Sequence, residues 1–393
     1  MNNRIIIMPF DVPCPNAYNG SEREVFKSDR EATRTPRRLQ RVLMLAVIAV
    51  LAVLIAYLLG SLGGKTGAIS GTKLRCVVTQ NITPFDDRIL YYDSGTLFCL
   101  STGGSELWKA SVGDNASFSA GEKQVAVWNG NQLMLFDKNG RSTYSDRLSE
   151  PIQFARVGSK YIAVITGSGV SPTLSVKDMN GSQIDSETIR YTDLMMLDCG
   201  FFGDGEYLWT TALDVYGSVP DISMLIYKVG TMNTGSVSLG DAITYSVIYS
   251  GSYLNVINTR QLRLYDYRGT ESTADSTLVY GWRLIGSLAT NNYPYLLFVL
   301  EADSTGAFSE LRLLHGKTDT RYSLPDSCVG AAIRSRRLYA FSSNSLYRAD
   351  TGEHRFSALR LPVDGLVTEY LGITSNGVAL LGCGNDVWAV SLP

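Results

Sequence analysis

None of the residues in this 393-residue chain that could carry chemistry has a partner at a diagnostic spacing. The two histidines, His315 and His354, each lie at or just after an expected hairpin turn, with no cysteine or second histidine at metal-ligand spacing. A Ser-His-Asp triad is not excluded by spacing alone, but no G-x-S-x-G elbow joins a strand to a helix. We expect both histidines to be solvated turn residues.

Paired carboxylates are the next candidates. Asp86 and Asp87 are adjacent, and the loop from Asp303 to Glu310 is acidic, so either could supply an acid and a base or hold a cation. Acids that are adjacent or in loops are usually solvated, and the chain has no D-x-D-x-D-G calcium loop. The sequence therefore predicts no catalytic residue, no metal site and no cofactor.

Six cysteines bear on redox chemistry, and Cys14 lies apart from the others near the N-terminus. The other five lie in or beside apolar strand segments: Cys76, Cys99, Cys199, Cys328 and Cys383. Because the apolar segment 42–60 separates Cys14 from these five, their odd number means that at least one of them stays unpaired or pairs between chains, and no C-x-x-C occurs. We expect buried thiols that act as small apolar groups.

Tyrosine is abundant, with 22 residues. Tyr91, Tyr92, Tyr245 and Tyr249 could line a surface that binds glycans or peptides. A strand position with one solvated end accounts for these tyrosines as well.

Short strands must position all of these residues except Cys14, because beyond Gly60 the sequence consists of short apolar segments separated by Gly, Asn, Asp and Ser turns. One series is typical of buried strands: Ile89–Tyr92, Val125–Trp128, Tyr161–Ile165, Tyr207–Thr211, Tyr253–Ile257, Tyr295–Val299, Leu338–Phe341 and Val378–Leu381. A second series follows it, with strands that start at Thr96, Leu133, Leu174, Met224, Leu262, Leu311, Leu346 and Val387.

The turn after the second series has the form D-x-x-G at Asp137–Gly140, Asp178–Gly181 and Asp266–Gly269, and a shorter form at Asp350–Gly352. The aspartate can accept a backbone N–H two residues on, and glycine supplies the positive φ that reverses the chain. The two series of strands recur eight times. Eight such strand repeats predict an all-β fold, an eight-bladed β-propeller with seven blades as the alternative. The segment Leu74–Thr79 would complete the C-terminal sheet and close the ring.

A different pattern precedes the repeats. Residues 42–60 contain no charge and no proline and are long enough to span a bilayer as one transmembrane helix. Arg34, Arg37, Arg38 and Arg41 precede this segment, which predicts that residues 1–41 form a disordered cytoplasmic head and that the body is extracytoplasmic. A cleaved signal peptide is the alternative, but no A-x-A-like site follows. The remaining domains are then a linker at 61–73 and a propeller ectodomain at 74–393.

Charge excludes one class of partner. Lys and Arg total 35 against 37 Asp and Glu, so the whole chain has no basic excess that would point to nucleic acid. Residues 1–41 hold eight of those basic residues and five of the acidic ones, which leaves a mildly acidic body.

A resemblance adds to this interpretation. The stretch Leu100–Trp108, in which Thr102-Gly103 leads to Trp108, resembles the repeat of PQQ-like (quinoprotein-type) propellers, whose tryptophan docks against the next blade. Tyr144 and Ile184 stand at the equivalent later positions, so the resemblance implies that docking is largely absent there. With the N-terminal anchor, the chain also resembles a membrane-anchored propeller family of unknown function from Gram-positive anaerobic bacteria.

The sequence thus favours a non-catalytic binding or scaffolding module on the extracytoplasmic side of the cell membrane. Its expected partner is a protein or a cell-wall component at one propeller face, without nucleic acid. The alternative is a propeller enzyme, such as a PQQ-dependent dehydrogenase with its site in the central channel.

Overall fold

The computed structural model describes residues 50, 69–232, 235–303 and 306–393. The chain divides into two compact units, Met1–Lys65 and Thr66–Pro393, and all described residues except Val50 belong to the second. The expected head, Cys14 and all but one residue of the expected span at 42–60 lie outside the described residues. In the part that is described, no helix is both long and apolar enough to cross a membrane.

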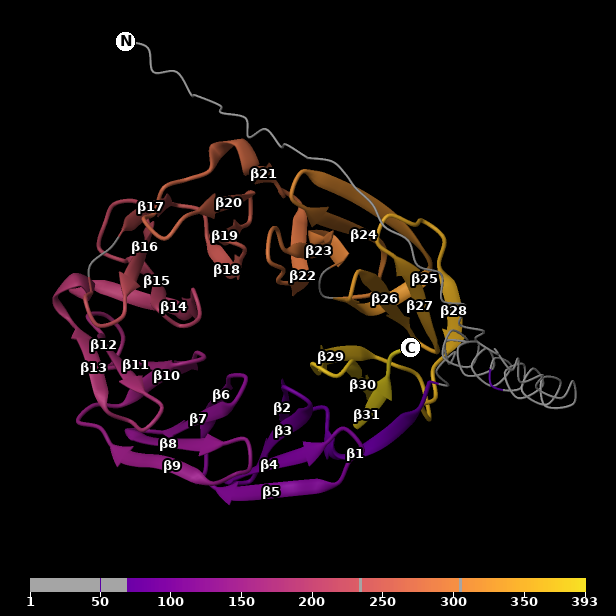
Figure 1. Ribbon diagram of the computed structural model, residues 1–393, viewed down its shortest axis with the longest axis horizontal. Coiled ribbons are helices and arrows are strands. Elements are labelled where there is room, and N and C mark those ends of the chain that lie inside the picture. The colour runs from indigo at the N-terminus through magenta and orange to yellow at the C-terminus, as the bar shows by residue number, and fades with distance from the viewer. Residues whose placement is uncertain (1–49, 51–68, 233–234, 304–305) are drawn as a thin grey trace, which may run out of the picture. The chain divides into compact units, whose positions relative to one another are not determined.

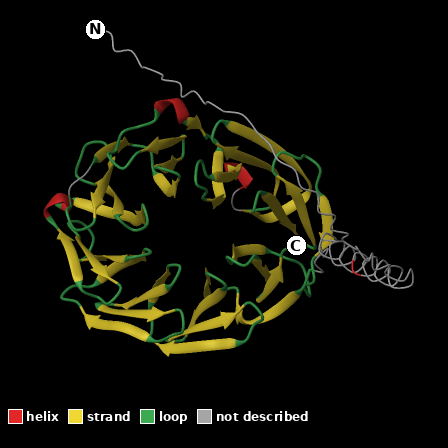
Figure 2. Ribbon diagram, viewed as in Figure 1, coloured by secondary structure: helices red, strands yellow, loops and turns green. Residues whose placement is uncertain are grey.

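The second unit is built from antiparallel strands, and its sheets are arranged around a common centre (Figure 1). Figure 2 shows that helix contributes little to this unit. Its described residues include three short 3-10 helices: η1 (Ile189–Tyr191), η2 (Thr273–Asp275) and η3 (Glu301–Asp303). The fold is therefore all-β.

Five four-stranded sheets follow one another along the chain, and in each the first strand lies nearest the centre. They are β2 (Asn81–Phe85), β3 (Arg88–Asp93), β4 (Thr96–Ser101) and β5 (Glu106–Ser111); β6 (Ser117–Ala120), β7 (Gln124–Asn129), β8 (Gln132–Asp137) and β9 (Ser142–Arg147); β10 (Ile152–Val157), β11 (Tyr161–Thr166), β12 (Thr173–Asp178) and β13 (Gln183–Glu187); β14 (Leu194–Phe202), β15 (Tyr207–Asp214), β16 (Asp221–Lys228) and β17 (Ser236–Gly240); β18 (Thr244–Ser250), β19 (Tyr253–Asn258), β20 (Gln261–Tyr265) and β21 (Thr277–Leu278).

A seven-stranded sheet comes next. It contains β22 (Trp282–Leu288), β23 (Tyr295–Leu300), β24 (Phe308–His315), β25 (Thr318–Arg334), β26 (Arg337–Ser342), β27 (Ser345–Asp350) and β28 (Ser357–Arg360). The long strand β25 pairs with β24 through its first half and with β26 through its second half, with a register shift between Cys328 and Gly330. Nothing in the turn pattern predicted that the last strand of one repeat would continue directly into the first strand of the next.

The last sheet contains both ends of the second unit, in the order β1-β31-β30-β29. Its strands are β1 (Gly71–Val77), β29 (Glu369–Ile373), β30 (Val378–Cys383) and β31 (Asp386–Ser391). Gly71 pairs with Val390, and Lys73 pairs with Trp388 and forms an ion pair with Asp386 at 2.6 Å. The predicted closure by an N-terminal strand is confirmed, although β1 starts earlier than Leu74.

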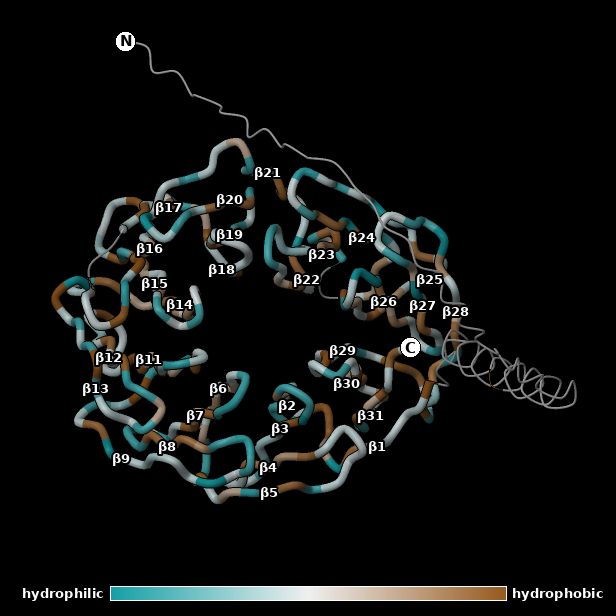
Figure 3. The backbone as a smooth tube through the Cα atoms, in the orientation of Figure 1, coloured by the Kyte–Doolittle hydropathy of each residue, from teal (hydrophilic) through white to brown (hydrophobic). Residues whose placement is uncertain are grey.

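Both predicted series of strands are confirmed. They are the second and third strands from the centre in the four-stranded sheets, and β23, β24, β26 and β27 in the seven-stranded sheet. Adjacent sheets bury their apolar faces against each other, as where Ala126 and Leu133 pack with Ile162 and Val164 of the next sheet. Figure 3 shows hydrophobic stretches mostly along the strands and hydrophilic stretches mostly along the connections. The core is thus a series of layers between neighbouring sheets.

The D-x-x-G turns have the predicted geometry. Asp178 accepts backbone N–H groups from Asn180 and Ser182, both at 2.8 Å, and Gly181 has a φ of 86°. Asp137 and Asp266 make the equivalent pairs of bonds, with N···O distances from 2.8 to 2.9 Å. These aspartates therefore act in chain reversal, as expected.

The same turns dock neighbouring sheets onto each other. The Trp108 ring of β5 packs on Gly140, and its Nε1–H donates to the Lys138 carbonyl oxygen at 2.9 Å. The Tyr144 ring of β9 packs on Gly181 in the same way, so the expectation that docking is absent after Trp108 is wrong for Tyr144. A tyrosine ring can therefore take the place of the tryptophan on a turn glycine, which lacks a Cβ.

Candidate functional site

The strands define two faces of the ring. Because neighbouring strands are antiparallel, the connections from first to second and from third to fourth strand lie on one face, which we call the turn face. The connections from second to third strand, and from one sheet to the next, lie on the opposite face. We call that face the pocket face.

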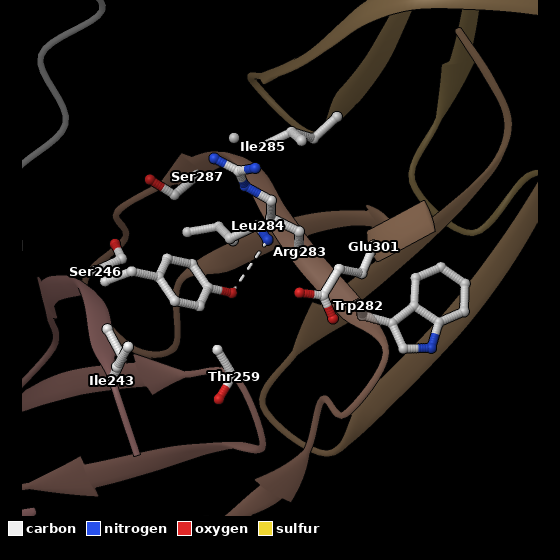
Figure 4. Close-up of a pocket in the computed structure, with 11 residues that line it drawn as sticks. Ile243, Ser246, Thr259, Trp282, Arg283, Leu284, Ile285, Ser287 and Glu301 are labelled. Carbon is white, nitrogen blue, oxygen red and sulfur yellow. Dashed lines mark hydrogen bonds between the residues drawn. The ribbon is translucent and has the colours of Figure 1, made fainter. Parts of the chain in front are cut away.

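A pocket of about 590 Å³ opens where the β18–β21 sheet meets the seven-stranded sheet (Figure 4). Its walls come from the innermost strands β18 and β22 and from nearby connections on the pocket face. The residues that line it are Ile243, Tyr245, Ser246, Thr259, Trp282, Arg283, Leu284, Ile285, Gly286, Ser287 and Glu301. This volume falls within the usual range for pockets that hold a small molecule.

Tyr245 links the two sheets across the pocket. Its hydroxyl accepts a hydrogen bond from the Leu284 backbone N–H at 3.3 Å, while the side chain stays 39% exposed. Burial raises the pKa of the Tyr245 hydroxyl; the Leu284 N–H and Arg283 act in the opposite direction, and Glu301 acts in the same one. Tyr245 is therefore a fixed neutral wall of the pocket, beside one cation and one anion.

Trp282 is held in place by two arginines. The Arg312 and Arg321 guanidinium carbons lie 5.6 and 5.2 Å from its ring centroids. Arg312 is 6% exposed and donates to Asp319 at 2.9 and 3.0 Å and to the Leu278 carbonyl oxygen at 3.0 Å. This network fixes that side of the pocket before any ligand arrives.

Exposed large apolar side chains gather on the pocket face. Nine of them lie within residues 189–280, on consecutive sheets, with exposures from 38 to 85%: Ile189, Met195, Val215, Tyr216, Val219, Ile243, Tyr245, Leu278 and Tyr280. We call this set the apolar sector. Leu366 is also exposed on this face but lies outside the sector, whereas Tyr267 belongs to the turn face.

Charge differs between the two faces. Among the described residues between strands, the pocket face has seven acids against two bases: Asp114, Glu150, Asp193, Asp241, Glu301, Asp303 and Asp364 against Arg190 and Arg260. The described connections of the turn face hold nine acids and eight bases. The pocket face is therefore both more apolar and more acidic.

The predicted acidic pair lies on the turn face and is part of the closure. Asp86 bonds to the Lys138 ammonium and accepts from the Ser375 hydroxyl, and Asp87 pairs with Lys138 at 2.6 Å. Lys138 holds the pKa of both carboxyls below the ordinary range, and these carboxylates raise the pKa of Lys138. The pair thus joins three successive sheets. The second acidic candidate, the Asp303–Glu310 loop, is described except at 304–305.

The two histidines are not brought together. His315 ends β24, and its ring stacks on Tyr295 at 3.9 Å between centroids. His354 is exposed in the turn after β27 and lies 5.3 Å from the Tyr322 ring. Across the described ranges, no group of three His, Cys, Asp or Glu side chains is arranged to hold a metal ion.

The five described cysteines are free and buried, as predicted. Burial raises the pKa of the Cys76 and Cys99 thiols to about 11 and that of the Cys328 thiol to about 12. Burial also raises the pKa of Cys199 and Cys383. Such thiols are weak nucleophiles at neutral pH.

Of the four candidate tyrosines, one contributes to the pocket. Tyr91 is buried and stacks on Phe98 at 4.8 Å, while the Tyr92 hydroxyl donates to the Gly113 carbonyl oxygen at 3.0 Å. Tyr249 packs against Phe202 at 5.3 Å. Of these four, Tyr245 alone reaches the pocket, because it is the second residue of the innermost strand β18, beside a connection on the pocket face.

Comparisons with known proteins agree with this architecture. The sequence model of the family of unknown function DUF5711 matches residues 68–323, more than half of the chain. No curated protein matches the sequence.

Solved structures support the fold. BamB from Moraxella catarrhalis superposes with a TM-score of 0.50 and 12% identity, over 83% of this chain and 98% of that one. Sqt1 from Saccharomyces cerevisiae gives a TM-score of 0.54 and 10% identity, over 81% and 99%. At this identity the likeness shows the fold alone. Together with the radial sheets, it identifies a β-propeller.

Proposed function

The chain belongs to the DUF5711 family of unknown function, and we propose that it is a non-catalytic binding or scaffolding propeller. A protein partner docks on the pocket face. The apolar sector carries this proposal, because its nine exposed side chains are concentrated on one face and one part of the ring. Such a concentration is typical of a protein-binding surface.

The turn face supplies the contrast that supports this choice. Its prominent polar and aromatic groups are used within the fold, as in the Asp86–Lys138 pair and the docking of Trp108 on Gly140. Trp108 also belongs to β5, the outermost strand of its sheet, so it is remote from a ligand in the central channel. These observations favour a binding module over a quinone-dependent enzyme.

We infer eight blades. Six four-stranded sheets count as one blade each, and the seven-stranded sheet counts as two that share β25. We also infer that the repeats are of the PQQ-like type, and the docking of Trp108 and Tyr144 on glycine turns supports this inference. A crystal or cryo-EM structure would contradict this count if the seven-stranded sheet did not divide at β25 into two blades of four strands each.

For location, we propose a single-pass signal anchor at 42–60 with the propeller outside the cell. Four arginines before an uncharged 19-residue segment support this orientation. Protease added to intact protoplasts should digest the propeller and spare an epitope tag on residues 1–41. Full protection of the propeller would overturn the proposal.

Photo-crosslinking in intact cells tests the proposed function. A photoreactive amino acid in place of Tyr280 or Tyr216 on the pocket face should give a discrete adduct with one partner protein. The same amino acid at Tyr267 on the turn face serves as the control and should not give that adduct. The absence of adducts from both pocket-face positions, or an identical adduct from Tyr267, would refute the proposed surface.

A further inference from the structure

We propose that the partner presents a cationic polypeptide segment with an uncharged aliphatic or aromatic side chain that enters the pocket beside Tyr245. This inference rests on the proposed function and specifies its ligand. It combines three features of the pocket face: an apolar wall, a balanced pair of charges inside the pocket, and acidic connections around it.

The apolar wall explains the anchor side chain. Ile243, Tyr245 and Leu284 line one pocket, and Ile243 is 64% exposed. The bond from the Leu284 N–H occupies the Tyr245 hydroxyl and fixes the ring. A side chain that enters therefore meets a wall that needs little ordering on binding, which favours affinity.

The charges inside the pocket explain why the anchor is uncharged. Arg283 and Glu301 both line the pocket, and they act on the Tyr245 pKa in opposite directions. Their charges therefore oppose each other where the anchor enters. A charged anchor would gain from one group and be repelled by the other.

The surrounding connections explain the cationic flanks. The two bases of the pocket-face connections are already engaged, since Arg190 pairs with Glu187 at 3.5 Å and Arg260 with Asp241 at 3.3 Å. The acids Asp193 and Asp303 lie on connections next to the apolar sector. Lysine or arginine beside the anchor would complement this surface and speed association.

The same charge argues against other occupants. An anionic cell-wall polymer or an anionic lipid surface would be repelled by a face with seven acids and two bases in its connections. A second copy placed face to face would bring the same acids together. A protein segment that is both cationic and apolar satisfies both properties of the face.

Fluorescence anisotropy with synthetic peptides tests the proposal on the full-length chain in a neutral detergent. Three peptides share the same apolar residues and differ only in having lysine, glutamine or glutamate at the other positions. A fourth peptide keeps the lysines and replaces the apolar residues by serine. We expect the first peptide to bind at least about tenfold more tightly than the others and to weaken as salt is raised.

Matched variants separate the two contributions. Ile243→Ser should weaken the lysine peptide about tenfold, whereas Leu366→Ser, at the same 64% exposure outside the sector, should change it less than about twofold. Asp303→Lys should weaken the lysine peptide and not the glutamine peptide. Glu122→Lys, on the turn face, is its control and should have no effect.

Several outcomes would overturn the inference. These are equal binding of the lysine and glutamate peptides, equal effects of Ile243→Ser and Leu366→Ser, or sedimentation showing that Ile243→Ser dissociates a homodimer. If photo-crosslinking from Tyr280 traps a partner through an acidic segment, the inference fails while the proposed function stands. If crosslinking finds no partner on this face, the proposed function fails as well.

Discussion

The two faces of the ring use similar residues for different purposes. On the turn face, Asp178 and Gly181 shape a reversal, and Tyr144 of the preceding sheet along the chain packs on that glycine. On the pocket face, Tyr216 and Tyr280 extend into solvent at 69 and 78% exposure. Tyr144 thus packs within the fold, whereas Tyr216 and Tyr280 are exposed and available to a partner.

Charge shows the same difference. On the turn face, Asp86 and Asp87 bind Lys138 of the next sheet, and Asp86 also accepts from the Ser375 hydroxyl of the C-terminal sheet, so these contacts contribute to ring closure. The pocket-face acids are not balanced by a similar number of bases. Substitutions on the turn face should therefore lower mainly the stability of the fold, and those on the pocket face should weaken mainly partner binding. Each of the following experiments tests that distinction.

The largest effect is expected where the ring closes. Deletion of residues 386–393 removes β31, which pairs with both β1 and β30. We expect loss of cooperative unfolding for the whole propeller, measured by circular dichroism, because two sheet edges lose their partner. Removal of Pro393 alone is the control. An unchanged melting midpoint after the longer deletion would show that β1 and β31 do not hold the ring together.

A smaller loss is expected from Gly181→Val. Valine would be strained at a φ of 86° and would also overlap with the Tyr144 ring, so we expect about 3 kcal/mol of destabilisation in denaturant unfolding. Gly230→Val is a matched control, because Gly230 has the same φ of 86° with open space where a Cβ would lie. If both variants lose the same stability, docking on the turn contributes nothing.

The Asp86–Asp87–Lys138 cluster predicts a modest dependence of stability on pH. Because Lys138 depresses the folded pKa of both carboxyls, their contribution is full above the unfolded pKa of about 3.9 and is lost as pH falls through the folded value. All three side chains are partly exposed, so Lys138→Met should lower the free energy of unfolding by about 1 kcal/mol or less at neutral pH. This difference from the wild type should disappear in strong acid. Lys123→Met, at an exposed turn-face lysine, is the control; a pH-independent difference for Lys138→Met would contradict the ion-pair origin.

The smallest effect on stability is expected at the pocket face. Tyr280→Ser should change the free energy of unfolding by no more than about 0.5 kcal/mol, because the side chain is 78% exposed. Tyr322→Ser should cost about 3 kcal/mol or more, because that tyrosine is fully buried and its hydroxyl accepts from the Gly352 N–H at 2.9 Å. Chemical denaturation measures both. A large loss for Tyr280→Ser would mean that the apolar sector is part of the fold.

The repeats were predictable because their determinants are local. An aspartate three residues before a glycine specifies a turn by itself, and an alternating apolar segment specifies a strand. The closing strand was predictable because the C-terminal sheet lacked a fourth member. The continuity of β25 was not, since Pro325 and Asp326 interrupt the apolar pattern at the point where the strand crosses between its two partners.

The pocket could not be found in the same way. Tyr245 and Leu284 are far apart in sequence, and their contact depends on how two sheets pack. From the sequence, Tyr91 and Tyr92 were as good candidates as Tyr245, but the structure uses them in local packing and in a turn hydrogen bond. The useful sequence feature would have been position: a large apolar residue in a connection, such as Tyr216 or Tyr280, has no strand face to cover it.

The pairing of β1 with β31 also has a consequence in time. Gly71 and its partner Val390 are separated by roughly 320 residues, and at about 5–20 residues per second that length takes tens of seconds to synthesise. During this interval β1 has been synthesised and β31 has not, so the backbone N–H and C=O groups of β1 that will pair with β31 are without their partner. Aggregation during synthesis should therefore depend on how β1 is kept apart from other chains before the last strand arrives.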